Sequence, residues 1–102
     1  NFPQKNIAIK QMNSGGAIVT TSIKGNKEET YSICKRLKLF TMAESLGGVE
    51  SLVCHPATMT HASVSSETKL KLGINDSLVR FSVGCEDIDD LLNDLDNALS
   101  AI

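Results

Sequence analysis

The sequence has no excess of basic residues. Ten Lys and Arg are set against twelve Asp and Glu, and the formal net charge is −2. Because nucleic acids and anionic lipid surfaces are bound through clusters of positive charge, the composition disfavours both as partners. The sequence also lacks an apolar run that approaches the ~20 residues of a membrane-spanning helix, so we expect no membrane segment.

Cysteine and histidine are scarce and scattered. The three Cys are an odd number at wide spacing, so we expect reduced thiols of a cytoplasmic protein and no disulfide framework. No Cys-x-x-Cys or His-x-x-x-His pair occurs, and we expect no metal site. A cysteine nucleophile would need a histidine and an orienting group, which the spacing does not indicate, so buried inert thiols are the expectation.

The beginning of the chain, Asn-Phe-Pro-Gln at residues 1–4, has neither an initiator Met nor a signal-peptide pattern. We therefore expect a processed or excised piece of a longer protein. With 102 residues, 41% of them hydrophobic, the chain is long enough to fold as one domain around one core.

Apolar patterns and turn residues predict a two-layer α/β domain of the α+β kind, with a mostly antiparallel sheet and helices on one face. Strands are expected at residues 17–23, 39–42, 52–54 and 77–83. Helices are expected at 27–38, from Ser65 or Ser66 through Leu72, and at 86–102, after a polar opening with no element of its own.

The last of these helices has a regular apolar spacing. Its expected buried stripe consists of Ile88, Leu91, Leu92, Leu95, Leu99 and Ile102. Its acidic residues are expected to face solvent, and those of the first turn, from Glu86 on, to favour the positive end of the helix.

Arg80 interrupts an apolar strand pattern at residues 78–83. A guanidinium without a partner is costly to bury, so this side chain must find an anion or reach solvent. Residue types leave two roles open: a structural ion pair with an internal carboxylate, or a two-pronged grip on a ligand carboxylate or phosphate. The sequence Ala-Glu-Ser-Leu-Gly-Gly at residues 43–48 offers a hydroxyl, a carboxylate and exposed amides, but it is equally consistent with a tight turn.

Three blocks of the sequence together resemble a known family. Residues 39–52, which include the Ala-Glu-Ser-Leu-Gly-Gly segment, are similar to a signature of the Cys/Met metabolism family of pyridoxal-phosphate enzymes. Residues 56–63 and 78–87 resemble the same family in the same order, and the similarity covers about residues 14–101. Within that family, Glu44 favours the cystathionine γ-lyase and γ-synthase group.

The resemblance implies that residues 1–102 are the small C-terminal domain of a fold-type-I enzyme with pyridoxal phosphate as its cofactor. A large preceding domain would carry the catalytic lysine, and the parent enzyme would be a cytoplasmic homotetramer of cysteine and methionine biosynthesis. By the same resemblance, Arg80 binds the substrate α-carboxylate, and Ser45 helps to frame substrate and cofactor. Glu44 would face the distal part of the amino acid, and Thr60 would lie in the same wall.

The expected substrate is cystathionine or a homoserine ester. The wording of residues 49–52 and 57–61 resembles bacterial γ-synthases slightly more, but these few positions do not choose between elimination and replacement at the γ-carbon. Lys69 follows Ser-Glu-Thr in a pattern like that around the family's cofactor lysine, but its following residues differ, and we expect no catalytic residue in this chain. The alternative is a non-catalytic truncated relative that serves as a binding module.

Overall fold

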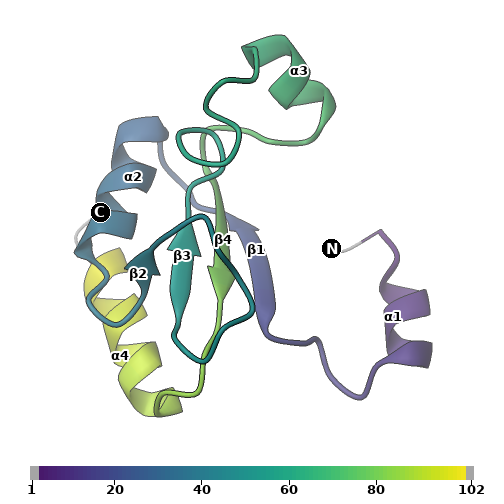
Figure 1. The fold of residues 1–102 in the computed structure, drawn as a ribbon, viewed down its shortest axis with the longest axis vertical. Coiled ribbons are helices and arrows are strands. Elements are labelled where there is room, and N and C mark those ends of the chain that lie inside the picture. The colour runs from purple at the N-terminus through teal and green to yellow at the C-terminus, as the bar shows by residue number, and fades with distance from the viewer. Residues whose placement is uncertain (1–2, 101–102) are drawn as a thin grey trace.

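Four short strands form one sheet in the order β1-β4-β3-β2 (Figure 1). The computed structural model describes residues 3–100. The strands are β1 (Ile18–Ser22), β2 (Thr41–Met42), β3 (Leu52–Cys54) and β4 (Leu78–Ser82). β4 pairs antiparallel with β1 and β3, and β2 pairs parallel with β3. The predicted α/β class with a mostly antiparallel sheet is confirmed, although the strand expected over residues 39–42 is only its last two residues.

The helices are α1 (Lys5–Gln11), α2 (Lys27–Arg36), α3 (Ser66–Lys71) and α4 (Ile88–Leu99). α2 and α4 pack together on one side of the sheet, whereas α1 and α3 stand apart from this layer (Figure 1). The expectation of helices on one face therefore holds for α2 and α4 only. Within residues 3–100, no helix combines the length and the apolar character needed to span a membrane.

α2 begins where its sequence predicts. The Asn26 side chain accepts a hydrogen bond from the Glu29 backbone N–H at 2.9 Å, and the Glu29 carboxylate accepts one from the Asn26 N–H at 3.1 Å. This reciprocal capping satisfies two N–H groups that the first turn leaves without helical partners. The helix ends at Arg36, two residues before the expected end.

The core lies between the sheet and the two packed helices. Its buried members are Ile33, Cys34, Leu37, Phe40, Val53, Val79, Leu91 and Ala98. Alternation along β4 assigns its residues to two faces: Val79 and Phe81 point toward this core, and Arg80 and Ser82 therefore point to the opposite face. We call this second surface the open face of the sheet.

The predicted buried stripe of α4 is wrong in part. Leu91 is 2% exposed, but Ile88 and Leu92 are 61% and 54% exposed. The helix is rotated so that Asp94 and Ala98 are buried with Leu91. Ile102 lies outside the described residues.

The contacts of Asp94 account for this rotation. The expectation that the acidic residues of α4 lie in solvent is wrong for Asp94, which is buried. Its carboxylate accepts hydrogen bonds from the backbone N–H groups of Lys38 and Leu39, both at 2.8 Å, and of Phe40 at 3.3 Å. A buried carboxylate needs such donors. Asp94 therefore holds the turn between α2 and β2.

α1 was not predicted. It buries none of its residues, and no side chain caps its first turn, so it lacks the apolar periodicity and capping signals by which a helix is recognised in a sequence.

Candidate functional site

The 43–50 loop, which joins β2 to β3, meets the open face at Arg80. The Arg80 Nη2 atom donates a hydrogen bond to the Glu44 backbone carbonyl at 2.8 Å. Two residues 36 positions apart in the sequence are thereby in direct contact, and Ser45 follows immediately in the loop. In the view of Figure 1, this teal connection passes across the sheet and turns back before it enters β3.

Arg80 has no internal carboxylate partner within residues 3–100. The ion pair found in this part of the chain joins Lys71 to Glu67 at 4.0 Å, on the surface of α3. The structural ion-pair role for Arg80 is therefore not supported. Of the five N–H donors that a guanidinium carries, the contact with Glu44 uses one.

Ser82 is a second anchor for the loop, and the sequence analysis did not single it out. Its Oγ accepts a hydrogen bond from the Gly47 N–H at 2.8 Å, and Ser82 is 2% exposed. Gly47 has a φ of +81°, a conformation that residues with a Cβ adopt at a cost. The signal was available, because the two-residue period of a strand places Ser82 on the same face as Arg80.

The end of the loop is held by a third set of hydrogen bonds. The Glu86 carboxylate accepts the Ser51 N–H at 2.9 Å and the Ser51 hydroxyl at 2.7 Å, while Ser51 Oγ accepts the Gly84 N–H at 2.8 Å. The Cys85 N–H donates to the Val49 carbonyl at 2.8 Å. Glu86 was expected in the first turn of the last helix, but α4 begins at Ile88, and Glu86 belongs to the loop contacts instead.

These contacts also affect the ionisation of Glu86. The hydrogen bond from the Ser51 N–H lowers the pKa of the Glu86 carboxyl, and the Ser51 hydroxyl and the Glu86 backbone N–H act in the same direction. Each donor favours the charged form of the carboxylate. Glu86 is therefore an anion at neutral pH, in the form that best accepts these hydrogen bonds.

The four residues expected at the site lie in two places. The side chains of Glu44 and Ser45 are exposed on the loop, next to Arg80. Thr60 lies in the turn after β3, where its hydroxyl is 2.7 Å from His61 Nδ1. Hydrogen bonds between residues 3–100 thus join Arg80 to the loop but not to Thr60.

Lys69 is engaged elsewhere. Its Nζ atom donates to the Ala57 carbonyl at 2.8 Å, and it lies on α3, which stands away from the sheet (Figure 1). A lysine ammonium bound to a carbonyl is a structural donor and not an available amine.

The expectation of buried thiols holds for Cys34 and Cys54 but is wrong for Cys85, which is exposed. Burial, and then the nearby Cys54, raise the pKa of the Cys34 thiol to about 11, so it stays protonated at neutral pH. His55 is fully buried, with Nδ1 2.8 Å from Thr58 Oγ1 and Nε2 2.6 Å from the Asp76 carbonyl. Among the described residues, no three His, Cys, Asp or Glu side chains gather into a potential metal site.

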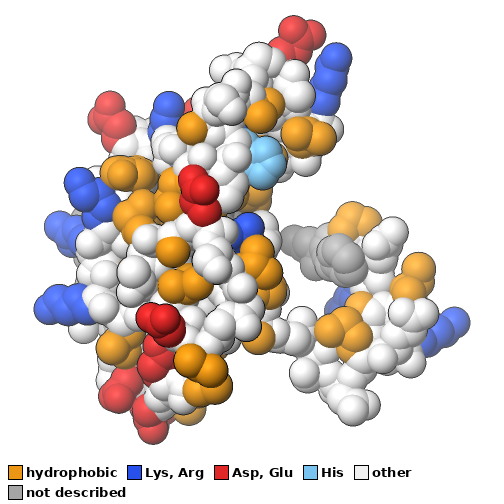
Figure 2. Space-filling model, viewed as in Figure 1, with side chains coloured by type: hydrophobic (Ala, Val, Ile, Leu, Met, Phe, Trp, Pro, Cys, Tyr) orange, Lys and Arg blue, Asp and Glu red, His pale blue; other side chains and the backbone are white. Residues whose placement is uncertain are grey.

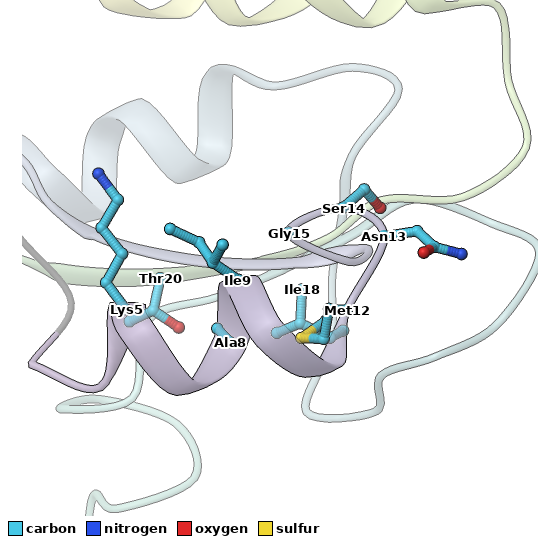
Figure 3. Close-up of a pocket in the computed structure, with 9 residues that line it drawn as sticks. All are labelled: Lys5, Ala8, Ile9, Met12, Asn13, Ser14, Gly15, Ile18 and Thr20. Atoms are coloured by element: carbon cyan, nitrogen blue, oxygen red, sulfur yellow. The ribbon is translucent and has the colours of Figure 1, made fainter.

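A groove of about 840 Å³ opens between α1 and β1 (Figure 3). Ile9, Met12 and Ile18 contribute apolar side chains to the groove. Thr20, which pairs with Arg80 in the sheet, also lines it. Figure 2 shows further hydrophobic side chains exposed in separate patches on this face, and Ile7, Ile9 and Met12 of the α1 region are among the exposed hydrophobic residues. The open face therefore combines one arginine with an apolar border.

The fold defines the class: a mixed α/β fold with a mostly antiparallel sheet, similar to solved structures of fold-type-I pyridoxal-phosphate enzymes. The chain belongs to the Cys/Met metabolism PLP-dependent enzyme family, which it matches over residues 1–100.

Two curated relatives illustrate the similarity. A cystathionine gamma-lyase of Dictyostelium discoideum is 52% identical over 99 residues, which are 97% of this chain and 26% of the relative. A cystathionine beta-lyase of Coxiella burnetii has the same identity and coverage. Overall similarity therefore does not separate enzymes named for the γ-position from those named for the β-position.

Two solved structures of cystathionine enzymes are also similar to this chain. The cystathionine gamma synthase of Xanthomonas oryzae pv. oryzae in complex with cystathionine has a TM-score of 0.87 and 43% identity, over 96% of this chain and 25% of that one. A cystathionine gamma lyase of Micromonospora echinospora has the same TM-score at 45% identity. The chain spans about a quarter of the length of these relatives.

Proposed function

We propose that this chain is the C-terminal, substrate-carboxylate-binding domain of a pyridoxal-phosphate enzyme that eliminates or replaces the γ-substituent of cystathionine or a homoserine ester. The observation that carries the proposal is Arg80. It lies on the open face beside the 43–50 loop, with most of its donors uncommitted in residues 3–100. Such a guanidinium can grip a carboxylate with two parallel hydrogen bonds.

In this proposal Arg80 anchors the end that all amino-acid substrates share. A fixed α-carboxylate orients the bonds of the α-carbon, which is where geometry matters most for the reaction. The carbonyl of Glu44 helps to hold the guanidinium in place before substrate arrives. The similarity to a synthase solved with cystathionine supports an amino-acid ligand of this kind.

The loop side chains would meet the rest of the substrate. Ser45 is placed to frame substrate and cofactor, and the exposed carboxylate of Glu44 to meet the distal part that differs between substrates. Thr60 is assigned a place in the same wall by resemblance alone, since its hydroxyl is bound to His61.

Pyridoxal phosphate does not fit the residues of this chain by themselves. Its phosphate needs several converging N–H donors, but the Gly47 N–H of the glycine-rich loop is already given to Ser82. The lysine in the most suggestive sequence context, Lys69, is bound to Ala57. We therefore assign the cofactor lysine and the phosphate site to a preceding domain and expect the chain alone to be inactive.

The remaining partners follow from the same assignment. The preceding cofactor domain is the primary one, and a cytoplasmic homotetramer is the expected assembly. The length of the encoded reading frame tests this part: a reading frame of only this size would favour the truncated binding module.

The test of the site is the substitution Arg80→Lys in the full-length enzyme. An ammonium keeps the charge but cannot form the paired coplanar hydrogen bonds of a guanidinium. A lost charge-assisted contact is worth about 1.5–3 kcal/mol, so kcat/KM should fall about ten- to a hundredfold on both cystathionine and a homoserine ester.

Glu44→Ala is the matched comparison. Because this side chain is proposed to meet the variable part of the substrate, it should change the preference between the two substrates more than the efficiency on both. Wild-type efficiency of a folded Arg80→Lys enzyme on both substrates would show that Arg80 is not the carboxylate anchor.

A further inference from the structure

We propose that Ser82, together with the Ser51–Glu86 pair, is the positioning device that sets the 43–50 loop over Arg80 and thereby tunes substrate recognition. The inference rests on the proposed function and deepens it. It assigns a role to three residues, none of which needs to touch the substrate.

The loop needs such anchors because of the connection that it makes. β2 and β3 are parallel neighbours, and residues 43–51 must carry the chain back to the start of β3 without a helix. Parallel strands are usually joined by longer crossovers that contain one. The loop residues from Glu44 to Glu50 are all exposed, so packing alone does not hold them.

Ser82 acts near the middle of the loop. Its buried Oγ accepts the Gly47 N–H, two residues after Ser45, and it lies two residues after Arg80 on the same face of β4. One strand therefore holds both the proposed carboxylate anchor and the support of the loop that faces it. This sets the separation of Arg80 from Glu44 and Ser45.

The Ser51–Glu86 pair acts where the loop ends. Ser51 is fully buried; its N–H and hydroxyl go to the Glu86 carboxylate, and its Oγ receives the Gly84 N–H. The approach at Gly84 is so close that a Cβ there would lie 2.6 Å from the Glu50 carbonyl carbon and would also meet the Val49 oxygen. The segment after β4 therefore holds the loop end directly against its own backbone.

These anchors differ from Arg80 in one respect that matters for function. The Arg80–Glu44 contact uses a group that the substrate carboxylate would also engage, so it can change when substrate binds. The Ser82 and Ser51–Glu86 contacts use no group assigned to substrate, and they can persist while substrate enters and leaves. The Ala43 N–H also donates to the Val53 carbonyl at 3.0 Å, so the loop is held at both ends and at its middle. In this proposal the contact that changes when substrate binds is the one between Arg80 and the Glu44 carbonyl.

The experiment compares Ser82→Ala, Ser82→Thr and Arg80→Lys in the full-length, cofactor-loaded enzyme, with cystathionine and a homoserine ester as substrates. Loss of one neutral hydrogen bond predicts that Ser82→Ala lowers kcat/KM about three- to tenfold, mainly through KM, and alters the ratio between the two substrates. Ser82→Thr keeps the hydroxyl and should restore most of the loss.

The outcomes separate the two proposals. If Arg80→Lys is impaired while Ser82→Ala keeps wild-type KM values and the wild-type substrate ratio, the positioning role is wrong and the proposed function stands. If Arg80→Lys is unimpaired, the proposed function itself fails. A fall in kcat/KM with an unchanged substrate ratio and no rescue by Thr would indicate a merely structural serine.

Glu86→Gln tests the same loop from its other end, and it decides the matter if Ser82→Ala does not fold. Gln keeps the size of the side chain but replaces one acceptor oxygen by an NH₂ group that cannot accept the Ser51 donors. A raised KM with an altered substrate ratio is expected. Unchanged kinetics in a folded, cofactor-loaded Glu86→Gln enzyme would overturn the proposal.

Discussion

The two faces of the sheet use the same strand for opposite purposes. Toward α2 and α4, β4 presents Val79, which is fully buried, and Phe81, whose ring meets Phe40 edge to face at a centroid distance of 5.3 Å. Toward the open face it presents Arg80 and Ser82, whose partners are backbone atoms of the 43–50 loop.

A charged group from each side of the sheet, Asp94 and Arg80, can be compared, and their environments differ. Asp94, on the helix side, is satisfied by three backbone N–H groups and is 8% exposed. Arg80, on the open face, donates to a single carbonyl in the described part of the chain. A fully satisfied buried charge stabilises a fold, whereas a charge with spare donors is available to a ligand.

The sharpest test of the helix-covered face compares Leu91→Ala with Leu92→Ala, neighbours on α4. Leu91 is 2% exposed and Leu92 is 54% exposed. Truncation of a buried leucine costs about 2–5 kcal/mol, because buried surface is lost and a cavity remains. Leu92→Ala should change the free energy of unfolding by less than about 0.5 kcal/mol.

Urea unfolding of the chain, followed by circular dichroism, measures both values. Equal destabilisation by the two substitutions would restore the originally expected stripe, with Leu92 in the core.

The next largest effect is expected from Asp94→Ala, with Asp96→Ala as the matched control on the same helix. Without the carboxylate, the N–H groups of Lys38, Leu39 and Phe40 lose their acceptor. Buried donors without acceptors cost about 1–3 kcal/mol, whereas the exposed Asp96 should be nearly neutral. Melting temperatures would check this. An unchanged melting temperature for Asp94→Ala would show that the Asp94 carboxylate does not stabilise the fold, and the contrast with Arg80 would be lost.

The smallest expected effect is the pH dependence of the stability that Glu86 contributes. Glu86 holds the end of the 43–50 loop, which lies over the open face. Hydrogen bonds from Ser51 lower the pKa of this carboxyl below its ordinary value of 4.5. The stabilisation is therefore fully present above the unfolded-state pKa and is lost as the pH falls through the lower folded-state pKa. The difference in unfolding free energy between the wild type and Glu86→Gln should be constant from about pH 7 to about pH 5 and shrink below that.

Denaturant unfolding at several pH values measures this difference, and Glu67→Gln, on the exposed surface of α3, provides a control that should vary little. A difference that stays constant well below pH 4 would show that the Glu86–Ser51 contact is not between a carboxylate and its donors.

Much of the fold was predictable because local signals coincide with the final structure. The capping pair Asn26 and Glu29 marks the start of α2, and the strands at residues 52–54 and 78–82 follow apolar patterns. The family was recognisable from three blocks of sequence, and within them Arg80 and the 43–48 segment were identified. A shared ligand implied that Ser45 and Arg80 approach the same side of the sheet. The hydrogen bond between Arg80 and the Glu44 carbonyl was not predicted.

Other features depend on partners distant in the sequence. Asp94 looks like one more acidic residue of a helix surface, and only its contact with a turn 54 to 56 residues away buries it. Ser51, Gly84 and Glu86 have no sequence pattern that relates them to each other, and α1 has neither a cap nor a buried stripe.

The sequence by itself thus determined the class of fold and the family, because periodicity, capping and motif spacing are properties of neighbouring residues. It also supplied the residue types that we propose for the ligand site. The tertiary structure alone decided which charges are structural and which are available. Whether Asp94, Arg80 or Glu86 finds donors, acceptors or open space depends on backbone groups that lie 35 to 56 residues away.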